Sequence, residues 1–238
     1  MSNSNKSDNR LLASLPLRVY QRLEPYLQTV KLSQNQILSI TGEHARYAYF
    51  PINSIISRVA VLENGAMTEI GIIGNDGMVG LPIILQTKQT FFSTIVQVGG
   101  HSLVINAEKL QEELNRQETL KRLLMHYVQA QIIQIGQIAA CNRHHKLKQR
   151  FARWLLMVRD AIQQDRFQLT HEFISQMLGV RRAGVTEIAG LFQKAGIIKY
   201  SRGTIEIIDN RKLEATSCEC YRTISRQTSK LLNIVLEE

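Results

Sequence analysis

Short β-branched runs separated by glycine-containing turns dominate the chain from residue 28 to residue 106, where eight of its fourteen glycines lie. The runs SIISRVAV and MTEIGII flank Asn64-Gly65, and Asn-Gly between two such runs is a strong hairpin signal. The segment STIVQVGGHSLVI predicts another pair of strands around Gly99-Gly100. Several short strands at close spacing favour a small barrel or sandwich over a parallel sheet.

Hydrophobic positions recur at helical spacing from about residue 107 to residue 142. One stripe repeats at steps of four and three residues, as on one side of a long helix. Its members are Leu120, Leu124, Tyr127, Gln131, Ile135 and Ile138. Two interpretations are open: a parallel partner helix in a homodimer, with Gln131 as a polar interruption that sets the register, or a helix that packs on the core of its own chain.

Beyond this helix the pattern predicts short helices and then a hairpin. HKLKQRFARWLLMVRDAI is one amphipathic helix, and LTHEFISQMLGVRRAGVTEIAGLFQKAGIIKY contains two more, separated by a tight turn at Gly179. Thr170 is a candidate N-cap, because its hydroxyl can accept from a free N–H of the first turn. IIKYSRGTIEIID predicts two strands about Ser201 and Arg202. Helices in this order, followed by a hairpin, are typical of a winged helix-turn-helix unit, whose second helix enters the major groove of DNA.

The second of these two helices begins with Arg181 and Arg182, although positive charge at a helix N-terminus costs about 0.3–1 kcal/mol. Arginine at this end can neutralise a phosphate or bond to guanine O6 and N7, so DNA would offset the cost. The alternative is a helical hairpin in some other kind of domain. The candidate DNA-binding residues are Thr170, His171, Arg181, Arg182, Thr186, Glu187, Ser201 and Arg202.

Positive charge is concentrated in the C-terminal part of the chain. Residues 143–238 contain 17 Lys and Arg against 10 Asp and Glu, whereas residues 1–142 contain 12 against 10. A local basic excess is the electrostatic footprint of nucleic-acid binding. A membrane-surface role would instead need one basic amphipathic helix with bulky apolar residues opposite, and the charge is spread over several segments.

Several other classes of protein lack support in the sequence. No run approaches the ~18 apolar residues of a membrane span, and the polar start resembles no signal peptide, so we expect a cytoplasmic protein with no membrane partner. We find no nucleophile–base grouping, P-loop, dinucleotide fingerprint or HExxH, and expect no enzyme. With 238 residues and 44% hydrophobic content, the chain can form one large domain or two ordinary ones.

The three cysteines, Cys141, Cys218 and Cys220, include no CxxC pair. We therefore expect reduced thiols, with no metal and no bound cofactor. A redox or metal role for Cys218 and Cys220, with His144 or His145 if folding brings them near, is the alternative.

The order of these parts resembles the Crp/Fnr superfamily of bacterial transcription factors, the cyclic-AMP receptor protein and fumarate-nitrate regulator group. The resemblance extends from Leu11 to about Tyr221 and rests on GNDGMVGLP, the long helix and the winged helix-turn-helix. It implies an α+β fold with a double-stranded β-roll sensor domain of the cyclic-nucleotide-binding type. It also implies a homodimer formed through the long helix, sequence-specific binding to palindromic double-stranded promoter DNA, and RNA polymerase as a partner.

The resemblance divides the chain into five parts. They are an N-terminal tail with short helices (1–27), the β-roll sensor domain (28–106), a linking and dimerisation helix (107–142), the winged helix-turn-helix domain (143–210) and a C-terminal extension (211–238).

Departures from the family pattern concern the effector. Members that bind cyclic AMP carry a Gly-Glu-Leu run followed by an Arg-Ser or Arg-Thr pair, whereas this chain keeps Gly80 but has Leu81, Phe91 and Phe92 at the other positions. A buried cyclic phosphate without its arginine would be an unpaired charge. We therefore expect no cyclic-AMP binding in the usual mode and an effector that is unknown. Two alternatives are open for the pocket: it takes an apolar or different ligand, or protein side chains fill it, which Phe91 and Phe92 slightly favour. Members with an iron–sulfur cluster use cysteines near the N-terminus, and this chain has none before Cys141.

The recognition helix also departs from the best-known members, because its later positions are Ala183 and Glu187 where they carry glutamate and arginine. Arg182 keeps the position that reads guanine, but the glutamate is lost and the later charge is reversed, so we expect a different half-site. The alternative function is a small-molecule or redox-sensing binding protein whose DNA binding is weak or non-specific.

Overall fold

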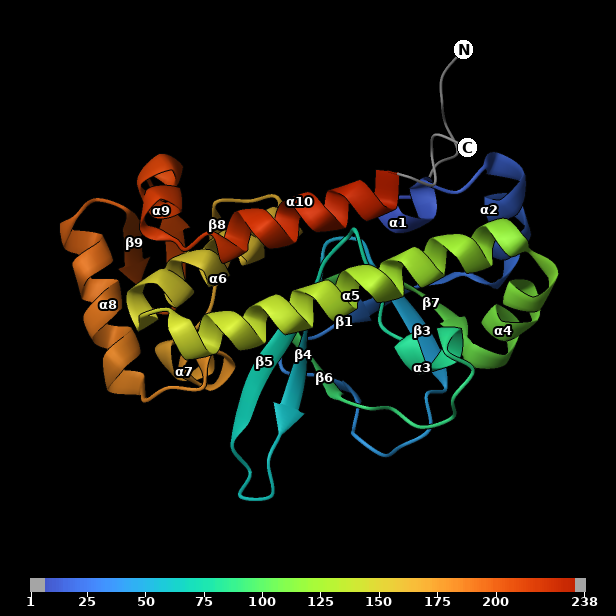
Figure 1. Ribbon diagram of the computed structural model, residues 1–238, viewed down its shortest axis with the longest axis horizontal. Coiled ribbons are helices and arrows are strands. Elements are labelled where there is room, and N and C mark those ends of the chain that lie inside the picture. Colours follow the sequence, from blue (N-terminus) through green and yellow to red (C-terminus); the bar gives the residue numbers. More distant parts are fainter. Residues whose placement is uncertain (1–6, 234–238) are drawn as a thin grey trace, which may run out of the picture.

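The computed structural model describes residues 7–233. The ends of the expected N-terminal tail and C-terminal extension, residues 1–6 and 234–238, lie outside the described residues. Figure 1 shows the helix-turn-helix part at one end of the long axis and α2 and α4 at the other, with the long helix α5 running between them. The short N-terminal helices are α1 (Arg10–Ala13), α2 (Leu17–Leu23) and the 3-10 turn η1 (Glu24–Tyr26).

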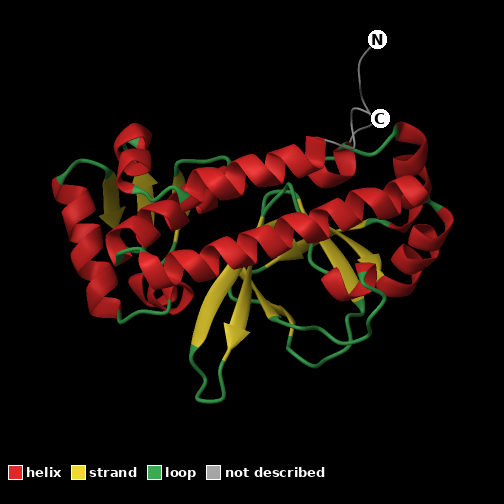
Figure 2. Cartoon of the chain, in the orientation of Figure 1, coloured by secondary structure: helices red, strands yellow, loops and turns green. Residues whose placement is uncertain are grey.

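Two antiparallel sheets form the N-terminal part, as the expected β-roll requires. Their strand orders are β1-β7-β3 and β2-β6-β4-β5. The strands are β1 (Gln28–Leu32), β2 (Ile37–Ser39), β3 (Tyr47–Pro51), β4 (Ile55–Val61), β5 (Met67–Ile73), β6 (Ser93–Val98) and β7 (Gly100–Asn106). The hairpin predicted around Asn64-Gly65 is confirmed, since β4 pairs with β5, and Gly65 has φ +80°. This hairpin projects from the body of the molecule (Figure 2).

The pair of strands expected around Gly99-Gly100 exists, but the two strands lie in different sheets. The chain changes sheet at Gly100, where a Cβ would lie 2.7 Å from the carbonyl oxygen of Asn53. Glycine is needed at this point because the two backbones approach too closely for a side chain.

The helical stretch after the sheets is broken once. Helices α4 (Ala107–Arg116) and α5 (Glu118–His144) meet at Gln117, whose extended backbone interrupts the expected continuous helix. A short helix, α3 (Leu81–Ile84), lies beside both of them. Among residues 7–233, none of the helices has both the length and the apolar character that crossing a bilayer demands.

The stripe predicted for the dimer contact faces the interior of its own chain, which corrects that expectation. Leu120, Leu124, Tyr127, Gln131 and Ile138 are buried, and Ile135 is half-buried. The periodicity identified an apolar stripe correctly, but the same chain covers it. Leu120, Leu124 and Tyr127 pack in a cluster of the N-terminal part, and Ile138 packs in the cluster that contains α6.

The C-terminal part matches the predicted helices and hairpin and adds three elements. Its members are α6 (Leu147–Ile162), β8 (Arg166–Gln168), α7 (His171–Leu178), α8 (Arg182–Lys194), β9 (Ile198–Ser201), β10 (Thr204–Ile207), α9 (Asn210–Thr216) and α10 (Cys220–Asn233). Strand β8 adds to the predicted hairpin in the order β8-β10-β9. Helix α10 lies alongside α5 (Figure 1).

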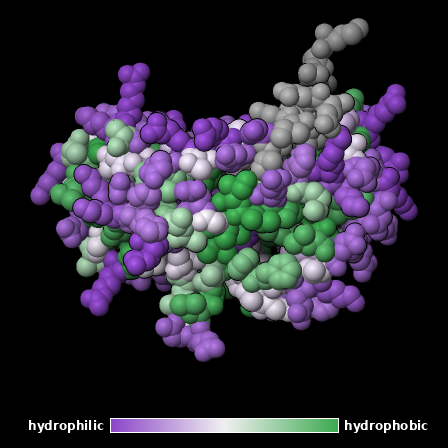
Figure 3. All heavy atoms as spheres, in the orientation of Figure 1, coloured by the Kyte–Doolittle hydropathy of each residue, from purple (hydrophilic) through white to green (hydrophobic). Residues whose placement is uncertain are grey.

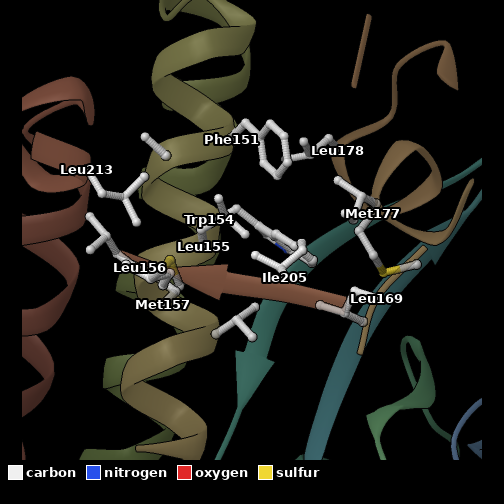
Figure 4. Close-up of a cluster of buried hydrophobic side chains, with 14 of the residues drawn as sticks. Phe151, Trp154, Leu155, Leu156, Met157, Leu169, Met177, Leu178, Ile205 and Leu213 are labelled. Atoms are coloured by element: carbon white, nitrogen blue, oxygen red, sulfur yellow. The ribbon is translucent and has the colours of Figure 1, made fainter. Parts of the chain in front are cut away.

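A shared hydrophobic core joins the two parts. Ile55 and Ile72 of the sensor sheets belong to the same buried cluster as Phe151 and Trp154 of α6, and Figure 4 shows Trp154 among the side chains around it. The indole Nε1 of Trp154 donates to Glu69 Oε1 of β5 at 2.8 Å. The sensor and the helix-turn-helix therefore pack as one body in this arrangement.

Candidate nucleic-acid interface and sensor cavity

The first motif helix, α7, has the ends that the sequence predicts. Thr170 caps it, because its Oγ1 accepts from the N–H of Phe173 at 3.1 Å. Gly179 ends it at φ +61°, and the N–H of Val180 donates to the carbonyl of Ser175 at 2.9 Å. This pair of features is a Schellman end, which satisfies the last carbonyls and turns the chain toward α8.

The second motif helix, α8, begins at Arg182 and directs its two arginines outward. Arg181 is the N-cap residue without a capping side chain, and both arginine side chains are exposed. The opposite face is buried through Val185, Ala189 and Phe192. Packing of that face compensates for a start that is electrostatically unfavourable, and it leaves Arg181 and Arg182 available to an external anion.

His171 has a packing role that the sequence did not reveal. Its Nδ1 lies 3.0 Å from Thr186 Oγ1, and that hydroxyl donates to the carbonyl of Arg182 at 3.1 Å. Since the hydroxyl has one hydrogen, His171 Nδ1–H is the donor in the first bond. The ring also stacks on Tyr200 of the wing at 4.1 Å.

The direct contact of His171 with DNA stays a prediction, and the ring has a second role within the protein. Its Nδ1 is engaged, and its buried Nε2 has no hydrogen-bond partner within residues 7–233. Burial, assisted by the charge of Arg182, lowers the pKa of His171, so its neutral form is favoured. The residue connects α7, α8 and the wing.

The wing ends in a tight turn at Arg202 and Gly203. Ser201 pairs with Thr204, and the two residues between them have φ +49° and +78°. Two positive φ values in a two-residue loop are the mark of a type I′ turn, which suits the twist of a hairpin. Ser201 and Arg202 are exposed at this tip.

A cavity of about 530 Å³ opens in the sensor domain, and its lining includes Gly80, Leu81, Phe91 and Phe92. Gly80 has φ +127°, a conformation that side chains disfavour. Phe91 is 47% exposed and Phe92 is half-buried. The alternative in which these two rings fill the pocket is thus wrong, because they lie on its wall and leave space inside.

Arg58 is a cavity residue that sequence reasoning missed. It comes from β4, lines the cavity and is only 3% exposed. Its Nη1 donates to Gln131 Oε1 of α5 at 2.7 Å. Burial lowers its pKa, opposed by the neighbouring Tyr127. The available signal was one charged residue in the β-branched run SIISRVAV, and only the fold shows which cavity that position faces.

The three cysteines, expected to be reduced thiols, are free and lie in one buried cluster. The donor atoms of Cys141, His145, Cys218 and Cys220 are all within 4.8 Å of one another. His144, the other histidine considered from the sequence, is exposed and is not part of this group. Four potential ligands therefore converge, which is the arrangement that the alternative metal role for Cys218 and Cys220 requires.

Comparisons with known proteins agree with this architecture. Residues 149–216 match the Crp-like helix-turn-helix domain family. FixK2 from Bradyrhizobium japonicum has a similar fold, with a TM-score of 0.70 and 12% identity over 81% of this chain and 98% of that chain. A putative transcriptional regulator of the Crp/Fnr family from Eubacterium rectale gives a TM-score of 0.65 and 18% identity over 87% and 96% of the two chains.

The c-di-GMP responsive global regulator CLP from Xanthomonas campestris is similar at a TM-score of 0.64 and 12% identity, over 82% of this chain and 100% of that one. No curated protein sequence matches the chain. Residues 149–216 thus form a Crp-like helix-turn-helix domain, and the chain has the fold of the Crp/Fnr superfamily of transcriptional regulators.

Proposed function

We propose that the protein is a sequence-specific DNA-binding transcriptional regulator, which binds a palindromic promoter site as a homodimer and acts on RNA polymerase. The observation that carries the proposal is the start of α8. Two exposed arginines lie there, on a helix whose other face is buried in a Crp-like helix-turn-helix domain. The first turn of a recognition helix is the part that reaches base edges.

Different roles follow for the exposed residues. Arg182 reads guanine through O6 and N7, and Glu187 accepts from cytosine N4. Arg181, with Ser201 and Arg202 at the wing tip, contacts phosphates, which position the domain without specifying sequence. Thr170 and Thr186 support this surface, because their hydroxyls are occupied by the N-cap bond and by the bonds to Arg182 and His171.

The dimer uses the face of α5 that the chain leaves open. Met125, Gln129, Ile132, Gly136 and Ala139 are exposed, and they alternate at steps of four and three residues. Hydrophobic surface lies over the middle of the molecule in Figure 3, where α5 crosses it. An exposed seam of this period suits a parallel copy of the same helix, and Gly136 permits close approach.

The sensor cavity takes a small anionic effector other than cyclic AMP in its usual mode. The family's cyclic-phosphate arginine is replaced, but Arg58 and Arg46 both line the cavity. A buried guanidinium without a carboxylate is a site for an anion. Arg58 also bonds to Gln131 of the long helix, so an anion that draws Arg58 away alters α5 directly. The similar fold of CLP, a c-di-GMP responsive regulator, supports effectors of other kinds.

The test of the proposal is selection of bound sequences from random double-stranded DNA by the full-length protein at physiological salt. We expect enrichment of an inverted repeat whose half-sites are centred about 34 Å apart. Binding that shows no preference over bulk DNA overturns the proposal and favours the alternative, a small-molecule or redox-sensing protein. Thermal-shift measurements with anionic metabolites, cyclic AMP and c-di-GMP then test the cavity, with Arg58→Met as the variant expected to lose the response.

A further inference from the structure

A buried cluster of potential metal ligands lies where the long helix ends. Cys141 is in the last turn of α5, and His145 is the residue that caps this end. Cys218 lies in the short connection between α9 and α10, and Cys220, two residues later, is the first residue of α10. All three cysteines are at most 4% exposed. Residues far apart in sequence are thus brought to one point, and none of them lines the sensor cavity.

The donor separations suit one tetrahedral ion. Cys141 Sγ and Cys218 Sγ are 3.5 Å apart, and Cys220 Sγ lies 3.5 Å from His145 Nδ1. Zinc bonded to sulfur at about 2.3 Å and to nitrogen at about 2.0–2.1 Å places its ligands roughly 3.5–3.8 Å from one another. No pair of the four atoms exceeds 4.8 Å, so small side-chain rotations complete the coordination.

The histidine is oriented in the way that metal-bound histidines are. Its Nε2 lies 3.3 Å from Glu219 Oε2, while Nδ1 faces Cys220. A carboxylate that accepts from the second ring nitrogen sets the tautomer and makes the first nitrogen a better ligand. Gln137 Nε2 also lies 3.1 Å from Cys220 Sγ, as a hydrogen-bond donor suited to a thiolate.

Nearby charge favours anionic sulfur. Arg150 and Arg153 both lie close enough for electrostatic interaction with Cys141. Arg153 is 2% exposed, and its Nε has no hydrogen-bond partner within residues 7–233. A divalent ion with three thiolates and one neutral histidine carries a net charge of about −1. Arg153, which also lies near Glu69, offsets this charge in the interior.

We propose that Cys141, His145, Cys218 and Cys220 form a tetrahedral site for a single zinc-type divalent ion. The ion fastens the segment after the helix-turn-helix domain to the end of α5. Cys141 and Cys218 are 77 residues apart, and the DNA-binding domain lies between them. The ion therefore closes a loop around that domain and restricts its rotation about the α5–α6 junction.

The first test is the metal content of the full-length protein, purified in reductant without chelators and then dialysed against zinc. Elemental analysis is expected to give about one zinc per chain, and cobalt substitution should give the absorption of a tetrahedral thiolate site. A chain without bound zinc and with three titratable thiols overturns the proposal. So does a Cys141–Cys218 disulfide in place of the metal, or iron with inorganic sulfide.

The second test uses matched histidine variants. His145→Ala should lose the cobalt spectrum or weaken zinc binding by at least tenfold, whereas His144→Ala, which changes the exposed neighbour, should bind as the parent does. Glu219→Gln should weaken binding by about 10–100-fold without abolishing it. Equal zinc affinity in the two histidine variants overturns the four-ligand assignment.

Protection of the thiols supplies a readout that requires no variant to fold. In the unaltered protein, zinc should slow the reaction of all three cysteines with a thiol reagent, and a strong chelator should restore it. Unchanged reactivity with and without zinc counts against the site. None of these measurements uses DNA, so failure of the metal site and failure of the regulator proposal are distinguishable.

Discussion

At the scale of single residues, Arg182 shows how position gives one side chain its role. It begins α8, is exposed and offers its backbone carbonyl to Thr186, which His171 holds from the other side. The helix start is therefore fixed by hydrogen bonds while the guanidinium stays outside. Such an arrangement suits a base-reading arginine, since the backbone that carries the guanidinium is already ordered and loses less entropy on binding.

Replacement of Arg182 by alanine should reduce DNA affinity selectively. One bidentate contact to guanine disappears, so the binding free energy that distinguishes guanine from the other bases at one position of each half-site should fall by about 1–3 kcal/mol. Competition binding against single-base variants of the selected site measures it. Arg18→Ala, an exposed arginine of α2, makes the same change of charge and should leave the preference intact. Equal loss on every sequence would instead place Arg182 on a phosphate.

Glu69 is a second residue whose behaviour follows from its surroundings. Burial raises its pKa to about 7, against the opposing effects of Ser57, Trp154 and Arg153. Ser57 Oγ lies 2.7 Å from Glu69 Oε2 and 2.8 Å from Gln97 Oε1. A protonated Glu69 donates to Ser57, which then donates its own hydrogen to Gln97.

This carboxyl should make stability depend on pH. The folded state holds the proton of Glu69 more tightly than the unfolded chain does. Its contribution to the free energy of unfolding is therefore complete below about pH 4.5 and is lost as the pH rises to about 7. That contribution is at most about 3 kcal/mol. Glu69→Gln cannot ionise and should therefore gain stability relative to the parent between pH 5 and pH 8 in urea unfolding. Glu63→Gln, on the exposed hairpin loop, is the control. A constant difference across pH contradicts the expectation.

At the scale of elements, the ends of helices were predictable and their faces were less so. Thr170 and Gly179 mark the ends of α7 through local chemistry, a capping hydroxyl and a left-handed backbone. The stripe of α5 was recognised, but its assignment to a dimer was wrong, because periodicity identifies an apolar face without identifying its partner. The break at Gln117 and the strand β8 had no comparable local signal.

The open face of α5 should carry the dimer contact. Ile132 is 65% exposed on that face, and Ile132→Lys would place two charges together in the seam of a parallel pair. We expect the dimer dissociation constant to rise at least about tenfold, by 1.4 kcal/mol or more, in sedimentation equilibrium. Leu62→Lys, at 63% exposure on the hairpin loop, should leave it unchanged. An unaltered Ile132→Lys dimer would move the contact elsewhere.

At the scale of the whole molecule, buried contacts link the β-roll with its cavity, the long helix and the helix-turn-helix domain. Arg58 reaches Gln131 of α5, and Trp154 of α6 reaches Glu69 of β5. A change in the β-roll can therefore reach the two helices that lead into the helix-turn-helix, α5 through Arg58 and α6 through Glu69. An effector acts through them only if it binds one arrangement better than another.

The symmetry of a dimer makes a prediction about DNA spacing. Insertion of five base pairs between the half-sites turns one of them by about half a helical turn, away from its recognition helix. Affinity should fall to that of a single half-site in a gel-shift titration. Substitution of the five central base pairs without a change of length is the control and should cost much less. Equal affinity for both DNAs would show independent half-sites.

The sequence by itself determined the local structure and the kind of fold. Turn glycines, caps and hydrophobic periods act over a few residues, and the basic excess needs only counting, so the β-roll, the helix-turn-helix and the resemblance to Crp/Fnr regulators were accessible. Only the tertiary structure decided which face of α5 is buried, that Arg58 enters the cavity, and that Cys141, His145, Cys218 and Cys220 converge. Those facts depend on contacts between residues tens of positions apart, which no local pattern encodes.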